Sequence, residues 1–328
     1  HLWKNTERVF TGNDTVPPHT GLPEGADPYD ESSYDKFWLD VYSPDMMFEE
    51  IRAFVDENRD NPFFLYWATP IPHLPLQAPP EWVDYYAEIF GDEEPYTGDR
   101  GYFPHPKPRA AYAAMVSYLD NNVGLLVQQL RDLGIFDNTL IIFASDNGPS
   151  YTGGTDSPWF NSAGPFSEEN GRVKGYVYEG GIRVPMIASW PGMIKPGSVT
   201  DHVSAFWDVM PTLAEIAGVR PPEDIDGISF LPALIGERDQ LQHDYLYWEF
   251  PAYQGQQAVR MGRWKAIRKN IFRGNMKIEL YDLENDPGET RDLAGQYPEI
   301  ISQIDSIMKA ARVPAELDRF RFKELGDE

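Results

Sequence analysis

The sequence lacks cysteine entirely, in all of its 328 residues. Disulfide bonds, thiolate metal sites and cysteine nucleophiles are therefore excluded within these residues. The sequence also lacks any run of about 18 apolar residues, which a transmembrane helix needs, and its first residues do not resemble a signal peptide. Because the first residue is His1 rather than methionine, we expect the chain to begin partway through a longer product.

Basic residues are scarce. The sequence has 28 lysines and arginines against 52 aspartates and glutamates, which gives a formal net charge of −24. Nucleic acids and anionic membranes bind to basic patches, so both are excluded as expected partners. This excess of acidic residues favours solubility in a salty or extracytoplasmic setting. An anionic substrate would require positive charge to be concentrated locally in its site.

Hydrophobic periodicity predicts an α/β protein. Residues 1 to about 43 are polar and rich in proline and glycine, and are expected to form surface loop. Apolar residues at helical spacing predict helices, and continuous apolar runs predict strands buried on both faces. Strand, helix, strand with short connections is typical of a mostly parallel sheet flanked by helices. The expected order is helix 43 to about 60, strand 63–68, helix 108–133, strand 139–144, strand 184–189 and helix 209–216.

The pattern changes after about Gly236. Short apolar runs separated by turn residues predict an antiparallel meander, followed by a last helix at about 298–311. The predicted strands are 245–249, 257–261, 264–267 and 279–283. We therefore predict two domains, with residues 1–235 in a large α/β domain and residues 236–328 in a small α+β subdomain.

Three motifs hold residue types suited to an anionic ester. Hydrolysis of a phosphate or sulfate ester needs a metal or cations to absorb charge, and a proton donor for the leaving group. The first motif, Ser145–Gly148, follows the predicted strand 139–144. The Asp146 carboxylate and the Asn147 amide oxygen are hard ligands suited to Ca²⁺ or Mg²⁺. Asp-Asn-Gly is also a sequence typical of turns, so this motif alone is consistent with a metal site and with an ordinary turn.

The other two motifs each supply one candidate cation. His73 lies between Pro72 and Pro75 after the predicted strand 63–68, and its imidazole can donate a proton or contact sulfate near neutral pH. Lys174 lies in Gly171–Gly175, where glycines let the backbone approach a small anion while the ammonium reaches it. In isolation, a surface histidine and a solvated basic turn are the alternatives.

Spaced as they are, these motifs resemble those of the sulfatase family, whose members share the alkaline-phosphatase-like fold. The resemblance covers nearly the whole chain. It implies a sulfuric ester hydrolase that acts on an aryl sulfate or a sulfated carbohydrate in the periplasm or outside the cell. Further similar segments are Leu119-Asp120, Asp208–Thr212, Arg260–Lys265 and Leu280–Leu283 with Asp286-Pro287.

The resemblance also implies roles for four residues. Asp146 and Asn147 would be two of the four side-chain ligands of a calcium ion, with magnesium as the alternative. His73 and Lys174 would be catalytic residues that contact the sulfate, and His73 would help to protonate the leaving oxygen. The family's nucleophile is a formylglycine hydrate made from the first residue of a Cys/Ser-x-Pro-x-Arg motif. Its attack on sulfur displaces the alcohol, and collapse of the hemiacetal then releases sulfate.

The chain departs from the family pattern at the nucleophile. It has no cysteine, and no serine begins a Ser-x-Pro-x-Arg run. The paired N-terminal aspartates that would complete the metal site also have no candidate ahead of His1. We therefore expect that an N-terminal segment is absent, that the isolated chain is inactive, and that it associates with that segment or with itself.

Two other functions stay open. A phosphodiesterase or phosphonate monoester hydrolase of the same fold would use the same metal and cations. A non-catalytic carbohydrate-binding or assembly fragment would depend on neither His73 nor Lys174. Trp248, Glu249 and Tyr253 form a polar-aromatic segment that suits either a sugar pocket or an exposed sheet edge.

Overall fold

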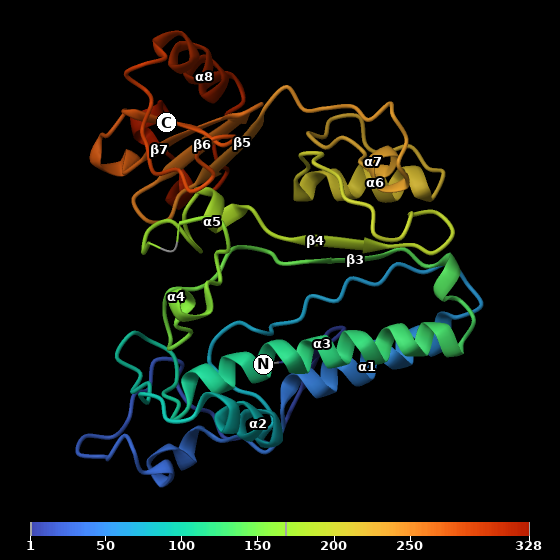
Figure 1. The fold of residues 1–328 in the computed structure, drawn as a ribbon, viewed down its shortest axis with the longest axis vertical. Coiled ribbons are helices and arrows are strands. Elements are labelled where there is room, and N and C mark those ends of the chain that lie inside the picture. The colour runs from blue at the N-terminus through green and yellow to red at the C-terminus, as the bar shows by residue number, and fades with distance from the viewer. Residues whose placement is uncertain (1, 168, 328) are drawn as a thin grey trace. The chain divides into compact units, whose positions relative to one another are not determined.

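The structure, a computed structural model, describes residues 2–167 and 169–327. The chain divides into two compact units (Figure 1). Unit 1 comprises His1–Asp137 and Ser150–Asp156, and unit 2 comprises Asn138–Pro149 and Ser157–Glu328. The predicted division near residue 236 stays a prediction. No helix in the part of the chain that the structure describes is long and apolar enough to cross a membrane.

Unit 1 is mainly helical. The helices predicted from residues 43 and 108 are confirmed, and each has a proline in its first turn, where the missing N–H has no helical partner to lose. The sequence analysis does not predict α2, although this helix also has a proline, Pro80, in its first turn. The elements of unit 1 are β1 (Leu2–Lys4), β2 (Glu7–Val9), α1 (Ser43–Asn58), α2 (Pro80–Phe90) and α3 (Pro108–Asp132).

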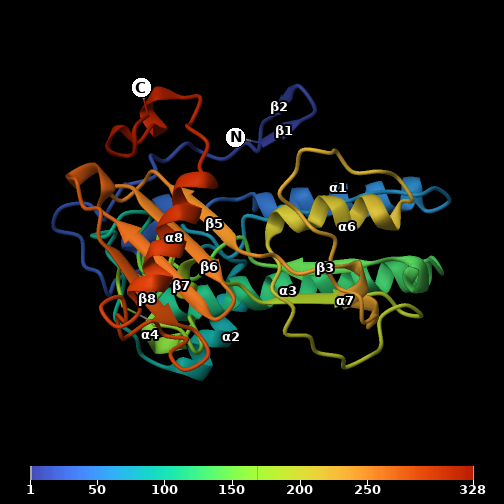
Figure 2. The same cartoon turned by 90° about the horizontal axis from the view of Figure 1, so that it is seen from above.

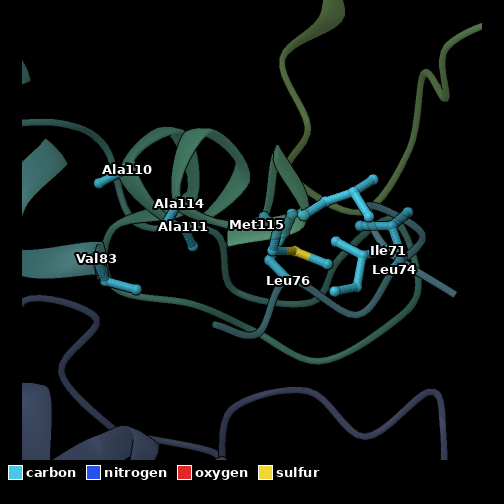
Figure 3. Close-up of a cluster of buried hydrophobic side chains, with 9 residues drawn as sticks. Ile71, Leu74, Leu76, Val83, Ala110, Ala111, Ala114 and Met115 are labelled. Carbon is cyan, nitrogen blue, oxygen red and sulfur yellow. The ribbon is translucent and has the colours of Figure 1, made fainter. Parts of the chain in front are cut away.

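The core of unit 1 lies between α2, α3 and the loop that carries His73 (Figure 3). Small alanine side chains on α3 let α2 approach closely, and larger side chains from the loop fill the remaining space. Burial of the loop's apolar residues fixes the backbone on both sides of His73. The cluster comprises Ile71, Leu74, Leu76, Val83, Ala110, Ala111, Ala114, Met115 and Leu119.

The segment predicted as a buried strand at 63–68 is not a paired strand, which corrects that expectation. Its side chains alternate between half-buried and exposed, and Phe64 and Tyr66 are 68% and 79% exposed. Alternation is what an extended backbone produces. A strand also needs a hydrogen-bonded neighbour, and the described part of unit 1 places none beside this segment.

Unit 2 contains two separate sheets and several short helices. Its strands are β3 (Ile141–Ala144), β4 (Met186–Ser189), β5 (Leu246–Phe250), β6 (Gln256–Met261), β7 (Trp264–Lys269) and β8 (Ile278–Asp282). Its helices are α4 (Ser157–Phe160), α5 (Glu179–Ile182), α6 (Val209–Ile216), α7 (Leu231–Ile235) and α8 (Pro298–Ala310). The predicted helices at 209–216 and about 298–311 are confirmed.

The first sheet corrects the parallel pairing expected for its strands. β3 and β4 pair antiparallel, with Ala144 opposite Met186 and Ile141 opposite Ser189 (Figure 1). A parallel pair needs a crossover that carries the chain back along the full length of the strands. Here the segment 145–185 leaves and returns at the same end of the pair, and its helices α4 and α5 have four residues each. The second strand therefore runs in the opposite direction.

The second sheet confirms the predicted meander. Its strands are antiparallel in the order β5-β6-β7-β8, and α8 packs across one face (Figure 2). Val259, Ala266 and Leu280 face α8, while the alternating residues Ala258 and Ile267 face the opposite side. There they pack against residues 176–178. The sheet is thus covered on both faces, and one cover is the segment that immediately follows Lys174.

The core of unit 1 provides a stability test. Leu76 is 2% exposed, so Leu76→Ala should lower the free energy of unfolding of unit 1 by about 2–5 kcal/mol through lost burial and the cavity left behind. Leu241→Ala, at a side chain 71% exposed, is the control and should change stability by less than about 0.5 kcal/mol. Denaturant unfolding measures both, and equal effects would contradict the assigned core.

Candidate functional site

The turn after β3 presents two hard oxygen groups. The Ser145 hydroxyl donates to the Asn147 carbonyl at 2.8 Å, which closes the turn. The Asn147 side-chain amide donates from Nδ2 to the Gly148 carbonyl at 2.9 Å, so its Oδ1 keeps free lone pairs. Asp146 is exposed, and its carboxylate has no hydrogen bond or ion pair with another described residue. Both oxygens are therefore able to accept an external ligand.

Two backbone hydrogen bonds join this turn to the lysine segment within unit 2. The Lys174 N–H donates to the Pro149 carbonyl at 3.1 Å, and the Gly148 N–H donates to the Gly181 carbonyl at 2.9 Å. The approach is close, since a Cβ on Gly148 would lie 1.8 Å from the Gly180 carbonyl oxygen. Glycine is thus required at 148 for the Asp146–Asn147 turn to sit beside the lysine segment.

Lys174 is the uncompensated cation of that segment. Its ammonium makes no ion pair with a carboxylate among residues 2–167 and 169–327. The neighbouring Arg172, in contrast, pairs with Glu169 at 3.3 Å and lies 4.4 Å above the Tyr178 ring. Lys174 can therefore offer its charge to an anion, whereas Arg172 is occupied in holding the segment together.

His73 belongs to unit 1 and is exposed there. Its Nδ1 lies 2.8 Å from the Leu74 carbonyl oxygen, which can only accept, so Nδ1 carries the proton. Its Nε2 is then the atom able to exchange a proton with a ligand. The Tyr102 ring packs edge-on against the His73 ring, with ring centroids 5.9 Å apart, and the buried Leu74 side chain fixes the adjoining backbone. The structure thus joins Asp146, Asn147 and Lys174 in one unit and places His73 in the other.

The donor chemistry of the turn fits part of a calcium or magnesium site. Carboxylate and amide oxygens are what both cations prefer, and calcium takes about six to eight oxygens in all. The Asp146 carboxylate and the Asn147 Oδ1 supply two. No cluster of three or more carboxylate, histidine or cysteine ligands occurs in the described residues. The turn therefore offers two oxygen donors, and its role as part of a metal site stays a prediction.

A buried charge cluster that the sequence analysis does not identify lies behind the lysine segment. Lys265 on β7 is fully buried, and its Nζ lies 2.6 Å from Oε1 of Glu179 and 3.8 Å from Oε1 of Glu289. Glu289 Oε2 accepts the Glu179 N–H at 2.7 Å. The one sequence signal is a lysine within an apolar strand, since Trp264 precedes Lys265 and Ala266 follows it.

Burial and pairing move the two carboxyl groups in opposite directions. Burial alone would raise the pKa of Glu179, but the Lys265 ammonium and its hydrogen bond outweigh this and hold that pKa below its usual range. Burial raises the pKa of Glu289 to about 7, because Lys265 and the Glu179 N–H compensate it only partly. Below neutral pH the cluster therefore contains one ammonium, one carboxylate and one protonated carboxyl.

Comparison with known proteins decides the family. The sequence model of the sulfatase family matches residues 2–219, which is most of the chain. The chain belongs to the sulfatase family. A second model, for the C-terminal region of N-sulphoglucosamine sulphohydrolase, matches residues 171–313. The chain thus shares the sequence features of the sulfatase family and the alkaline-phosphatase-like fold of its relatives.

The similar proteins are sulfatases of several kinds. The chain is 29% identical to human N-acetylgalactosamine-6-sulfatase over 290 residues, which cover 79% of this chain and 50% of that protein. It is 30% identical to human arylsulfatase A over 276 residues, which cover 76% and 49% respectively. A crystal structure of Ps i-CgsB matches with a TM-score of 0.65 and 30% identity, covering 82% of this chain and 55% of that one. The chain therefore spans about half the length of these curated relatives.

The raised pKa of Glu289 predicts a pH dependence of the stability of this chain. Between about pH 4.5 and 7 the folded chain keeps a proton on Glu289 that the unfolded chain releases, so this group makes stability fall as pH rises through that window. Glu289→Gln mimics the protonated form and removes this dependence. The free energy of unfolding of the variant minus that of the parent should be larger at pH 8 than at pH 5, by on the order of 2 kcal/mol.

Denaturant unfolding at the two pH values measures this difference. Glu284→Gln is the matched control, since the Glu284 side chain is 67% exposed, and it should show no such dependence. A Glu289→Gln variant whose stability runs parallel to that of the parent from pH 5 to pH 8 would contradict the buried, protonated carboxyl.

Proposed function

We propose that this chain carries the sulfate-binding residues and part of the metal site of a calcium-dependent sulfatase that acts on sulfated carbohydrate. One observation carries the proposal: the Asp146–Asn147 turn and the Lys174 segment are hydrogen-bonded side by side in unit 2. The segments that carry the hard oxygen ligands and the uncompensated ammonium are thereby neighbours along their backbones. A metal and a cation side by side are what a sulfate group requires, since its charge grows on the oxygens during displacement.

The roles of the residues are those that the family resemblance implies, and the chemistry of each side chain suits its role. The Lys174 ammonium would hold the sulfate oxygens, and the Asp146 and Asn147 oxygens would hold calcium, with magnesium as the alternative. Bound calcium would supply positive charge that polarises the sulfate ester. His73, with its proton on Nδ1, would use Nε2 to contact the sulfate and to donate a proton to the leaving oxygen once protonated.

The substrate class is supported by similar structures. One is described as BT4656 in complex with its substrate D-Glucosamine-2-N, 6-O-disulfate, and matches with a TM-score of 0.50 at 27% identity, covering 62% of this chain and 40% of that one. Another is Ps i-CgsB in complex with k-i-k-neocarrahexaose, with a TM-score of 0.67 at 27% identity, covering 89% and 64% respectively. These likenesses favour a sulfated carbohydrate over a simple aryl sulfate. A periplasmic or secreted location is part of the proposal.

The formylglycine nucleophile that this chemistry requires is not among these 328 residues, since no Cys-x-Pro-x-Arg or Ser-x-Pro-x-Arg motif occurs in them. The proposal therefore assigns the nucleophile, and the remaining metal ligands, to a segment outside this sequence. The extended segment 63–68, with Phe64 and Tyr66 exposed, is a candidate contact for such a segment or for a second copy of the chain.

Sulfate binding tests the role of Lys174. Titration of the chain with sodium sulfate should show binding that Lys174→Ala weakens about tenfold or more, because a charge-assisted contact is lost. Lys195→Ala, at an exposed lysine elsewhere in unit 2, is the control and should bind like the parent. The chain should give no turnover of 4-nitrophenyl sulfate. Unchanged sulfate affinity in Lys174→Ala would refute the assigned role, and measurable turnover would refute an external nucleophile.

Calcium binding tests the metal ligands. Two protein oxygens replace little of the hydration shell, so the chain should bind Ca²⁺ more weakly than about 10⁻⁵ M, and Asp146→Asn should weaken binding further. Asp201→Asn changes an exposed carboxylate elsewhere in unit 2 and should leave the affinity as it is. Submicromolar affinity, or an Asp146→Asn variant that binds like the parent, would contradict the partial site.

A further inference from the structure

A pocket of about 560 Å³ opens in unit 2 where β5 ends. One wall is the end of β5 and the turn after it, including Glu249 and Phe250. The other wall is the C-terminal segment, including Arg319, Phe320 and Phe322. The volume is within the range of small-molecule sites, about 300–1,000 Å³. None of these residues belongs to the motifs that hold Asp146 or Lys174.

The C-terminal wall is held firmly in place. Phe322 is 1% exposed and stacks on Phe272, with ring centroids 4.9 Å apart. Its backbone N–H donates to the Asp327 carboxylate at 2.7 Å. Gly255 makes room for the ring, since its φ is +77° and a Cβ there would lie 2.6 Å from Phe322. The pocket is therefore a preformed feature of the fold rather than a gap beside a loose tail.

The charges that line the pocket leave one cation unpaired. The Glu249 carboxylate accepts from the Tyr247 hydroxyl at 2.5 Å, from Gln257 at 3.1 Å and from Arg312 at 3.0 Å, so its charge is compensated. Arg319 is exposed and has no carboxylate partner among the described residues. Its guanidinium lies 4.6 Å from the centre of the Phe320 ring. In a chain of net charge −24, this pocket favours an anionic ligand.

We infer that the pocket binds one saccharide unit that carries a sulfate group. Phe250 and Phe320 are 37% and 38% exposed, and each offers an apolar ring face to the C–H face of a sugar. The Arg319 fork matches two oxygens of a sulfate. The sequence analysis considers Trp248 and Glu249 together as pocket residues. Trp248 lies beside Lys265 instead, with the Lys265 Nζ 5.5 Å from the centre of the Trp248 ring. The choice of sulfate rests on the proposed function, whereas the aromatic pocket and its free cation do not.

Calorimetric titration of the chain with N-acetylgalactosamine 6-sulfate, and with N-acetylgalactosamine itself, tests this inference. The Lys174→Ala background isolates the pocket from the proposed sulfate site, and it should retain binding. In that background Arg319→Gln should weaken binding of the sulfated sugar about tenfold and remove the preference over the unsulfated sugar. Phe320→Ala should weaken binding of both sugars about threefold to tenfold.

Matched controls are Arg238→Gln and Phe206→Ala, at an exposed arginine and an exposed phenylalanine elsewhere in unit 2. Both should bind like the Lys174→Ala parent. No binding in the Lys174→Ala background, or binding unaffected by Arg319→Gln and Phe320→Ala, would overturn the pocket while leaving the role of Lys174 intact. Binding in that background that depends on Arg319 would support the pocket even if Lys174 proves to have no effect on sulfate affinity.

Discussion

A buried ion pair between Lys265 and Glu179 joins the four-stranded sheet of unit 2 to the segment that carries Lys174. Both side chains are almost fully withdrawn from water, so neither charge is tolerable without the other. Glu179 begins α5, and residues 176–178 just before it cover one face of the sheet. The position of Lys174 therefore depends on packing and charge that lie several residues further along the chain.

Backbone contacts extend this constraint to the proposed metal ligands. The lysine segment bonds to Pro149, and Gly181 bonds to Gly148, so the Asp146–Asn147 turn is fixed to the same support. Close approach of Gly148 to Gly180 leaves no room for a side chain at 148. The backbone segments that carry a carboxylate, an amide oxygen and an ammonium are thus fixed to each other by hydrogen bonds. Such preorganisation is what an electrostatic site needs, because rearranging charges during a reaction would raise its barrier.

Several cations of unit 2 are engaged with carboxylates. Arg172, Arg183, Arg312 and Lys265 are all engaged with carboxylates, whereas Lys174 and Arg319 have no carboxylate partner among the described residues. Lys174 and Arg319 both lie in unit 2, one in the segment that the family resemblance assigns to sulfate and one in an aromatic pocket.

The sequence by itself determined the local elements and the chemistry of the motifs. Helical periodicity located α1, α3, α6 and α8, and short apolar runs between turn residues located the four strands of the second sheet, because these patterns reflect neighbours close in the chain. Only the tertiary structure decided the direction of β4 against β3, the burial of Lys265 beside Glu179, and the pocket between β5 and the C-terminal segment. Each of these depends on residues far apart in sequence, and strand direction in particular depends on the end at which the chain returns.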